Sequence, residues 1–303
     1  MCGIVGLFAR NEKLQRQLGG HLSAMLVELS DRGPDSAGVA FYRNPAARGR
    51  TKLTLFSQDP RFDWARLCTE LSEAFGEAVE PEVRASHAVM VVGGATEDLH
   101  TWIRRRHPEL RIMSSGDTIE IYKEAGRPGT VAERFQLRDM QGTHALGHTR
   151  MATESAVTTA HSHPFSTGED LCLVHNGSLS NHNRLRRRLL GEGIEFQTDN
   201  DSEVAAGYLT WRLREGATLE QALEDGLNDL DGFYTFAIGT RDGFAVVRDA
   251  IACKPAVLAE TDDWVAMASE FRAIAHLPGA DGARMWEPAP ATVYSWKRDG
   301  CAA

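Results

Sequence analysis

The second residue of the chain, Cys2, could act as a nucleophile. Methionine is commonly removed when a small residue follows it, and the chain would then begin with a residue that carries both a thiol and a free α-amine. The pKa of an α-amine is about 7.7–8.0 and that of a cysteine thiol about 8.5, so the amine can accept the thiol's proton near neutral pH. An N-terminal amine that activates its own nucleophile is a known form of covalent catalysis. Position alone leaves open that a cysteine stands second by accident.

Two polar clusters further along the chain could complete a site for an amide substrate. The segment GHTRMATES contains Arg150 and Thr153 at the end of an expected strand, and an arginine can hold a carboxylate through two parallel hydrogen bonds. The segment VHNG contains the side-chain amide of Asn176 and the backbone N–H of Gly177. Two neutral donors of this kind suit the oxyanion that forms when a carbonyl is attacked.

A third cluster, DNDSE, supplies Asp199 and Asp201 at the start of an expected helix. Either carboxylate could bind an ammonium group, and either could instead cap the N-terminus of the helix, as carboxylates often do. Together the three clusters would recognise an α-amino acid with an amide side chain. The arginine would bind its carboxylate, an aspartate its ammonium, and the two neutral donors its amide carbonyl.

Strands and helices are expected to position these residues. The apolar run at 3–9 predicts a buried strand that places Cys2 at the rim of a sheet, and apolar residues at helical spacing over 14–29 predict a helix. Further helices are expected at about 181–190, 202–214 and 219–230. The last of these begins with Thr218 and Gln221 in capping-box spacing. Strands, then helices, then strands again indicate layered sheets with helices packed outside.

A middle block at about 50–140 contains no candidate site residue. Its pattern predicts helices at 62–75 and from Thr96 to about Arg106, and strands at 85–92 and 117–124, in a βαβ-like order. The block has no glycine-rich phosphate loop and no catalytic cluster. Function is therefore expected on either side of it.

Composition narrows the class of protein further. The 303 residues carry a net charge of −9, which disfavours a nucleic-acid surface, and the basic stretches at 104–107 and 184–188 are expected to be solvated helix faces. No segment reaches the roughly 20 apolar residues of a membrane span, and the N-terminus does not resemble a signal peptide. Five cysteines without CxxC spacing fit a reducing compartment. A cytoplasmic protein is expected.

Six segments occur in the order found in class II glutamine amidotransferases, the N-terminal-nucleophile family: MCGIVGLF, RGPDSAG, GHTRMAT, HSHPF, VHNGSLSN and TDNDSEV. The sequence resembles that family over about 1–45 and 144–270. The resemblance implies an α+β fold of four layers, αββα, as a single domain over 1–303 with an α/β block inserted at about 50–140. It also implies that L-glutamine is the substrate and that this chain holds no cofactor of its own.

The resemblance implies catalytic roles for three residues. Cys2 would be the nucleophile, with its α-amine as the base. Asn176 and Gly177 would form the oxyanion hole. Arg32, in the RGPDSAG turn, resembles the family's arginine that packs beside the nucleophile, and we group it with the substrate-binding residues.

The resemblance also implies how glutamine is held. Arg150 would bind its α-carboxylate, with the region of Thr153 lining the site. Asp201 would bind its α-amine, and Asp199 is the second choice for that role. Two positions depart from the family pattern and leave specificity open, since Met151 stands where an aromatic residue is frequent and Glu154 where sugar-phosphate enzymes often have histidine.

Five histidines invite a zinc interpretation: His144, His148, His161, His163 and His175. Zinc requires three or four converging ligands. The family match places these residues in structural loops, and we expect no metal site.

The acceptor of the ammonia is expected on another polypeptide, because few residues follow the last family-like segment. Stand-alone glutaminase subunits with an extended middle occur in the GlxB-like group, which is tied to split relatives of glutamate synthase, including N-methylglutamate synthase. Their partner subunits carry FMN and iron–sulfur centres, so the resemblance implies a hetero-oligomer. Two alternatives stay open: an N-terminal-nucleophile amidohydrolase that acts on another amide, and a catalytically idle regulatory or scaffolding subunit.

Overall fold

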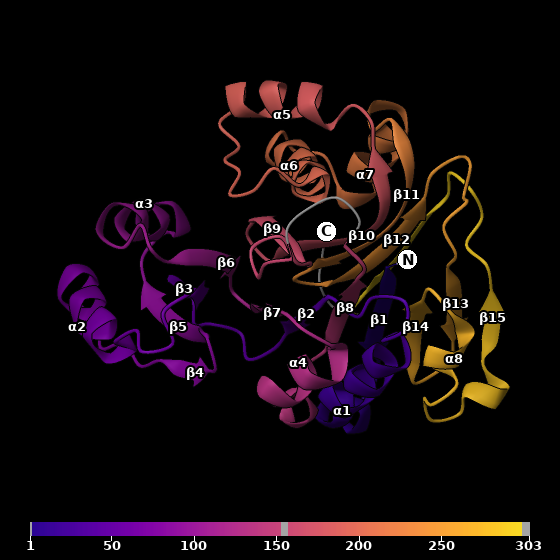
Figure 1. Ribbon diagram of the computed structural model, residues 1–303, viewed down its shortest axis with the longest axis horizontal. Helices are drawn as coiled ribbons and strands as arrows, with labels where there is room; N and C mark the ends of the chain where they lie inside the picture. The colour runs from indigo at the N-terminus through magenta and orange to yellow at the C-terminus, as the bar shows by residue number, and fades with distance from the viewer. Residues whose placement is uncertain (1, 153–156, 299–303) are drawn as a thin grey trace.

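The computed structural model describes residues 2–152 and 157–298, and two antiparallel sheets form its centre (Figure 1). The larger sheet has seven strands in the spatial order β15 (Arg284–Trp286), β13 (Val257–Glu260), β14 (Trp264–Ala268), β1 (Gly3–Ala9), β8 (His144–Arg150), β2 (Ser36–Tyr42) and β7 (Ile119–Ala125). The smaller sheet has five strands in the order β16 (Val293–Lys297), β12 (Gly243–Arg248), β11 (Gly232–Thr240), β10 (Leu171–Leu179) and β9 (Phe165–Gly168).

Strand β1 shows why its sequence is a continuous apolar run. Ile4 and Phe8 face the smaller sheet and join a core cluster that includes Val174 of β10. Val5 and Leu7 point to the opposite side and join the cluster beneath the helices. Successive side chains of a strand alternate between its two faces, and here both faces are buried. The predicted strand is therefore confirmed.

Helices cover the outer face of each sheet. On the larger sheet lie α1 (Glu12–Glu28), α4 (Pro128–Arg134), α8 (Phe271–Ile274) and the 3-10 turns η1 (Leu137–Asp139) and η2 (Ala280–Gly282). On the smaller sheet lie α5 (His182–Gly191), α6 (Asp201–Arg214) and α7 (Leu219–Asp229). Helix α7 begins with the predicted capping box, in which both bonds between Thr218 and Gln221 are present. The four layers αββα confirm the predicted fold class.

Residues 50–116 form a separate body with its own core (Figure 1). It consists of β3 (Arg50–Phe56), α2 (Trp64–Phe75), β4 (Glu82–Arg84), β5 (His87–Gly93), α3 (Thr96–Arg106) and β6 (Arg111–Gly116). The four strands are ordered β4-β5-β3-β6 and every pair is antiparallel. This βαββαβ arrangement is the ferredoxin-like, or split βαβ, motif.

The separate body is shorter than the block expected at 50–140. The strand predicted at 117–124 exists as β7, but it pairs with β2 in the larger sheet. Helix α4 and turn η1 then pack against α1. The chain leaves the inserted sheet at Gly116 because the next turn is bound by Asp170, whose carboxylate accepts the backbone N–H groups of 117, 118 and 119 at 2.7–2.9 Å.

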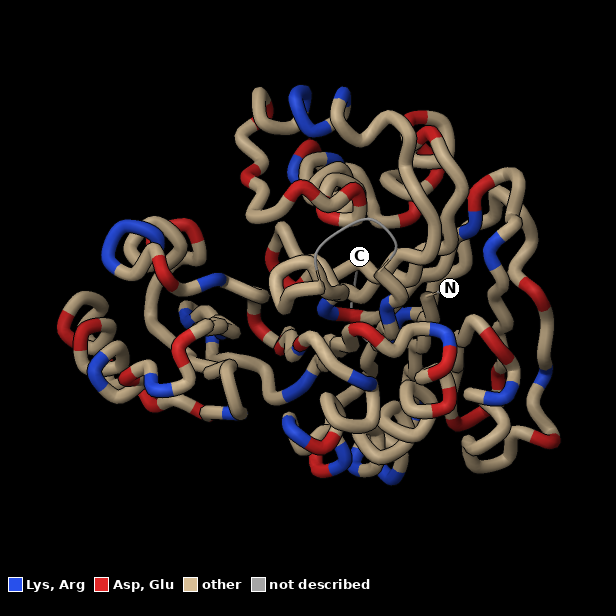
Figure 2. Tube along the Cα trace, viewed as in Figure 1, with Lys and Arg blue, Asp and Glu red and all other residues tan. Residues whose placement is uncertain are grey.

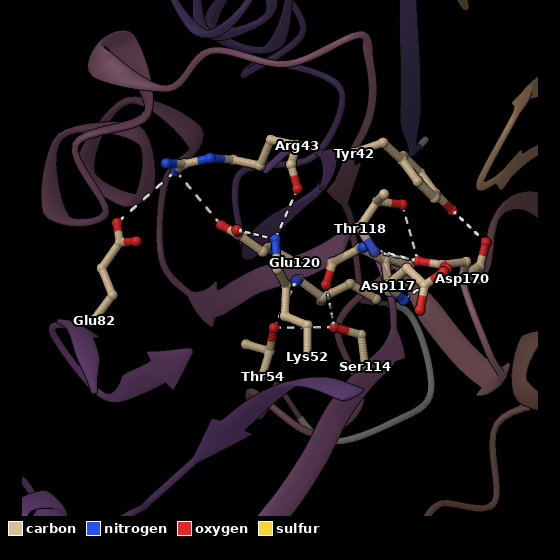
Figure 3. A network of polar contacts seen from close by, with 12 residues as sticks. Tyr42, Arg43, Lys52, Thr54, Glu82, Ser114, Asp117, Thr118, Glu120 and Asp170 are labelled. Carbon is tan, nitrogen blue, oxygen red and sulfur yellow. Dashed lines mark hydrogen bonds and ion pairs between the residues drawn. The ribbon is translucent and has the colours of Figure 1, made fainter. Parts of the chain in front are cut away.

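A buried ion pair joins the inserted body to the larger sheet (Figure 3). Lys52 Nζ of β3 lies 2.9 Å from Glu120 Oε1 of β7, and it donates to the backbone oxygen of Arg43 at 2.7 Å. Arg43 Nη1 lies 3.5 Å from Glu120 and 3.8 Å from Glu82. A buried charge is tolerated when it is paired and hydrogen-bonded in this way.

Acidic and basic residues are interspersed along the trace (Figure 2). One predicted basic helix face, at 184–188, is not simply solvated. Arg186 of α5 donates to the backbone oxygens of Thr198 at 2.6 Å and Asn200 at 3.0 Å, and so it fixes the segment that leads into Asp201. Over 2–152 and 157–298, no helix combines the length and apolarity that a membrane crossing requires.

Candidate active site

Cys2 lies half-buried at the start of β1, and its backbone oxygen is the meeting point of two predicted site residues. Arg32 Nε donates to that oxygen at 3.0 Å, and Asn176 Nδ2 donates to it at 3.2 Å. The thiol sulfur lies 3.9 Å from the backbone oxygen of Met151. Three segments far apart in the sequence are therefore brought together at the first strand.

The backbone after Cys2 is held firmly. Ile4 exchanges two 2.9 Å bonds with Ser269, because its N–H donates to Ser269 Oγ and its carbonyl accepts the N–H of Ser269. Gly3 pairs with Thr149 of β8, and a Cβ atom on Gly3 would lie 2.7 Å from Thr149 Oγ1. Glycine is thus required for the close approach of the two strands beside the nucleophile candidate.

Arg32 is oriented by a carboxylate that sequence reasoning missed. Its Nη1 lies 2.6 Å from Glu270 Oε1, and Arg272 Nε binds the other oxygen of Glu270 at 2.6 Å. The hydrogen bond from Arg32 lowers the pKa of Glu270. The guanidinium is therefore committed to the carbonyl of Cys2 and to Glu270, a geometry that positions the nucleophile candidate. Glu270 belongs to no recognisable motif, so only the fold could have identified it.

Gly177 occupies a backbone conformation that other residues rarely adopt. Its φ is +153°, and a Cβ atom there would lie 2.0 Å from the backbone oxygen of Phe233. It pairs with Tyr234 across β10 and β11. Since Asn176 is buried and Gly177 is exposed, the two predicted oxyanion-hole residues stand where the strand passes from the core to the open side of the site.

Arg150 ends β8 and is buried, with Thr149 next to it opposite Gly3. The RGPDSAG turn packs closely against this strand end, because a Cβ on Gly33 would lie 2.3 Å from the carbonyl carbon of Thr149. Asp35 completes the link: its N–H donates to the oxygen of Arg150 at 3.1 Å, and its carboxylate accepts the N–H of residue 152 at 2.8 Å. The predicted residues Thr153 and Glu154 lie outside the described residues.

Asp201 is the first residue of α6, and the helix is capped by its neighbour. The side chain of Asn200 accepts the N–H of Ser202 at 2.9 Å, so the capping role that the sequence left open belongs to Asn200. The carboxylate of Asp201, 22% exposed, accepts the N–H of Leu179 at 2.8 Å. The carboxylate remains partly open to a ligand. Leu179, which it binds, is the last residue of β10 and lies two residues beyond Gly177.

Asp199, the second choice for the ammonium, is placed differently. Its side chain is 88% exposed and is bound by His161 Nε2 at 3.0 Å. This bond lowers the pKa of Asp199. The pair connects the segment after β8 to the segment before α6.

Two buried histidines contact Ser202 next to Asp201, and a third, His148, contacts both of them. His163 Nε2 and His175 Nδ1 each lie 2.9 Å from Ser202 Oγ, which donates to Asp201 Oδ1 at 3.2 Å. A hydroxyl has one donor and two acceptor positions, so both imidazoles donate N–H groups to it. His148 Nε2 donates in turn to the oxygen of His175 at 3.0 Å.

Burial keeps these histidines neutral. It lowers the pKa of His148 to about 3, and it lowers the pKa values of His163 and His175. Each imidazole thus has one N–H in use and one ring nitrogen without a partner among the described residues. In residues 2–152 and 157–298, no three His, Cys, Asp or Glu side chains converge as metal ligands.

Comparisons with known proteins identify the family. A sequence-family model described as a glutamine amidotransferase domain matches residues 148–276. The chain is 56% identical over 297 residues to the glutamine amidotransferase-like protein GlxB of Rhizobium meliloti, and the match covers 98% of each chain. It is 31% identical to a putative glutamine amidotransferase of Methanothermobacter thermautotrophicus, over 97% of this chain and 99% of that one. The chain therefore belongs to the glutamine amidotransferase family.

Known structures agree with this class of fold. The glutamine phosphoribosylpyrophosphate amidotransferase of B. subtilis superposes with a TM-score of 0.60 at 20% identity, over 98% of this chain and 49% of that one. Together with the sheet order and layers, this match shows that the two proteins share the four-layer αββα fold. A shorter sequence match, 35% identity over 129 residues, links the chain to the glutamine–fructose-6-phosphate aminotransferase of Thermococcus kodakarensis and covers 21% of that protein.

Proposed function

We propose that this chain is a glutaminase that hydrolyses L-glutamine to glutamate and ammonia, with Cys2 as its nucleophile. The observation that carries the proposal is the convergence of Arg32 and Asn176 on the carbonyl of Cys2. An arginine and an amide from distant segments would have little reason to fix a backbone atom of residue 2 unless that residue had to be held in place.

The proposed reaction begins when Met1 is removed and the freed α-amine takes the proton of the Cys2 thiol. Sγ attacks the side-chain carbonyl carbon of glutamine, and the resulting oxyanion accepts hydrogen bonds from Asn176 Nδ2 and the N–H of Gly177. An amide nitrogen carries two hydrogens, so Asn176 can keep its bond to Cys2 while it serves the oxyanion. The α-ammonium then gives its proton to the amide nitrogen, the C–N bond breaks, and the nitrogen leaves as ammonia. Water hydrolyses the thioester, which releases glutamate and restores the thiol.

Recognition of glutamine is proposed to use both of its charges. Arg150 would bind the α-carboxylate, with the region of Thr153 beside it, and Asp201 would bind the α-ammonium. The proposal is supported by the position of Asp201, which is partly exposed and accepts the N–H of Leu179, two residues beyond Gly177. The engagement of Asp199 with His161 favours Asp201 over Asp199.

We propose further that the ammonia is consumed by a synthase subunit on another polypeptide, of the glutamate synthase or N-methylglutamate synthase type. FMN and iron–sulfur centres would then belong to the partner, and the assembly would be a cytoplasmic hetero-oligomer. This step is supported by the near end-to-end match to the GlxB protein. The fructose-6-phosphate aminotransferase of Thermococcus kodakarensis, by contrast, extends far beyond the matched region.

Glutamine hydrolysis by the purified chain and by Cys2→Ala tests the glutaminase. Wild type is expected to release ammonia and the variant to release none, with unchanged circular dichroism, while intact mass reports whether Met1 is removed. A glutamine analogue with a reactive diazoketone should label Cys2 and leave the buried Cys68 and Cys172 unmodified. Hydrolysis by Cys2→Ala at the wild-type rate would contradict the assignment. Addition of the synthase subunits is expected to raise the rate, and a rate that does not respond would contradict the proposed coupling.

A further inference from the structure

Lys123 of β7 is a buried lysine that the proposed reaction does not use. It is 4% exposed, and its Nζ donates to the backbone oxygens of Ser162 at 2.7 Å and Pro164 at 2.9 Å. The oxygen of Ala160 lies 3.5 Å away, and the ring of Phe165 is 4.5 Å from the nitrogen. An ammonium has three donors and no acceptor, so the three carbonyls match its hydrogen-bonding capacity. A single side chain thus holds the segment 160–164.

The held segment reaches directly to the candidate ammonium site. His163 lies between the two carbonyls bound most closely by Lys123, and its Nε2 donates to Ser202 Oγ at 2.9 Å. Ser202 in turn donates to Asp201 Oδ1 at 3.2 Å. The ring of His163 also stacks on His148 at 4.0 Å. A continuous chain of contacts therefore runs from Lys123 to the carboxylate of Asp201.

The larger sheet is shaped to receive this segment. A Cβ atom on Gly38 of β2 would lie 2.2 Å from the backbone oxygen of His163 and 2.4 Å from Cβ of Lys123. Only glycine leaves room for the segment to lie directly on the strand. Gly38 is the last residue of the RGPDSAG motif, so this motif serves both Cys2, through Arg32, and the His163 segment.

We propose that Lys123 is a positioning residue for recognition of the substrate's α-ammonium group. By fixing the backbone on both sides of His163, it keeps His163 and Ser202 in the arrangement that orients the carboxylate of Asp201. This inference rests on the proposed glutaminase function and adds a residue to it. Lys123 acts only through other groups and does not touch the substrate.

The test separates orientation of Asp201 from a general loss of active protein. The probe is 4-carbamoylbutanoate, which is glutamine without its α-amino group. The quantity measured is the ratio of kcat/KM for glutamine to kcat/KM for this analogue. A loss of folded enzyme lowers both values equally and leaves the ratio unchanged, whereas a displaced Asp201 lowers only the value for glutamine.

Lys52→Met is the matched control, because Lys52 is an equally buried lysine with a backbone carbonyl partner, on the inserted sheet. The ratio is expected to fall roughly 3- to 30-fold in Lys123→Met, the range for residues coupled to a site without touching ligand. It should recover at least partly in Lys123→Arg, which keeps a cation that can donate to several carbonyls. It should remain at the wild-type value in Lys52→Met.

The pH profile of the same ratio supplies a readout that does not require Lys123→Met to fold. Burial lowers the pKa of Lys123 to about 7. The negative charge of Glu203 of α6 raises the pKa of Lys123, and the positive charge of Arg111 of β6 lowers it. His163 and His87 also face the lysine, and both are neutral near pH 7. In wild type the ratio should fall between pH 6 and 8 as Lys123 loses its proton, and in Lys123→Arg it should stay level.

Two results would overturn the inference while the glutaminase proposal stands: a wild-type ratio in Lys123→Met, or the same fall in Lys52→Met. If wild type hydrolyses neither compound, the proposed function itself fails. The two failures are therefore distinguishable.

Discussion

At the scale of single residues, the site is organised around the backbone of Cys2. The nucleophile candidate is located by two side chains that bind its carbonyl and by strand pairing of Gly3 and Ile4. In the proposed reaction, this arrangement leaves the thiol, and the α-amine that loss of Met1 would free, available for chemistry. Reacting groups must be held within a fraction of an ångström of their productive geometry, and a chain terminus would otherwise fray.

Arg150 and Asp201 can be tested by charge removal. Removal of one partner of a buried charge pair typically costs about 2–5 kcal/mol, so Arg150→Met and Asp201→Asn should lower kcat/KM for glutamine by roughly 30- to several thousand-fold. Asp201→Asn should have little effect on hydrolysis of 4-carbamoylbutanoate, which lacks the ammonium. Asp199→Asn is the control and should stay within a few-fold of wild type. Equal hydrolysis of glutamine and the deaminated analogue by wild type would exclude a site for the free amino acid.

Gly177→Ala should affect both catalysis and folding. The added methyl would meet the oxygen of Phe233 at 2.0 Å, so the strand must shift and carry the N–H donor away from the oxyanion. Loss of one such donor lowers kcat by about 10²- to 10³-fold. Gly191→Ala at the end of α5 is the control, since nothing lies within 4 Å of its added methyl; it should leave kcat unchanged and raise stability by about 0.5–1 kcal/mol. Steady-state kinetics of both variants measure kcat, and urea unfolding measures their stability. A Gly177→Ala enzyme with wild-type kcat would be inconsistent with the oxyanion role.

At the scale of elements, local patterns predicted β1, α7 and β7 correctly because their signals lie within a few residues. The alternating DTIEIYKE segment is a strand, as expected, and Thr218 and Gln221 do form a capping box. The end of the inserted body at Gly116 was not predictable from those patterns. It depends on Asp170, which lies more than fifty residues further along the chain.

The same limit applies to the candidate site. Cys2, Asn176 and Arg32 could be selected from their motifs, and the fold brings them together. Glu270 and Lys123 could not be selected, because neither belongs to a chemical motif. Each becomes significant only when packing brings it to an arginine or to a set of backbone carbonyls.

Asp170 offers a test of the junction between the two bodies. Its carboxylate accepts three backbone N–H groups and the hydroxyl of Thr118. Each buried donor left without a partner costs about 1–3 kcal/mol. Asp170→Ala is therefore expected to lower the free energy of unfolding by about 3–5 kcal/mol in urea titrations. Asp262→Ala, at an exposed turn, is the control and should change the free energy of unfolding by less than about 0.5 kcal/mol. Equal stability of the two variants would show that the turn at 117–119 does not depend on Asp170.

At the scale of the whole molecule, the four αββα layers and the inserted body are joined by buried polar contacts as well as by apolar packing. The Lys52–Glu120 pair and the Asp170 turn connect three sheets (Figure 3). Buried histidines lie in the same molecule on both sides of this junction: His87 in the inserted sheet, and His144, His148, His163 and His175 in the central sheets and their connections. Their number makes the stability of the chain sensitive to acid.

The sign of that sensitivity follows from the pKa shifts. Burial lowers the pKa of His87 to about 3, of His144 to about 4 and of His148 to about 3, and it also lowers those of His163 and His175. Below the unfolded pKa of about 6.5, the unfolded chain binds protons that the folded chain does not, so the free energy of unfolding falls as pH falls. The loss continues until the pH reaches the folded pKa values of about 3 to 4.

Urea unfolding at pH 7.5, 6.5, 5.5 and 5.0 should therefore show a steep decline. Each buried histidine contributes up to about 1.4 kcal/mol per pH unit below pH 6.5, and five of them approach the total stability of an ordinary domain, about 5–15 kcal/mol. His87→Phe, which keeps a ring among Phe56, Tyr122 and Phe135, should flatten the curve by the contribution of one proton. A stability that is level between pH 7.5 and 5.0 would mean that these histidines take up protons in the folded chain as readily as in the unfolded one.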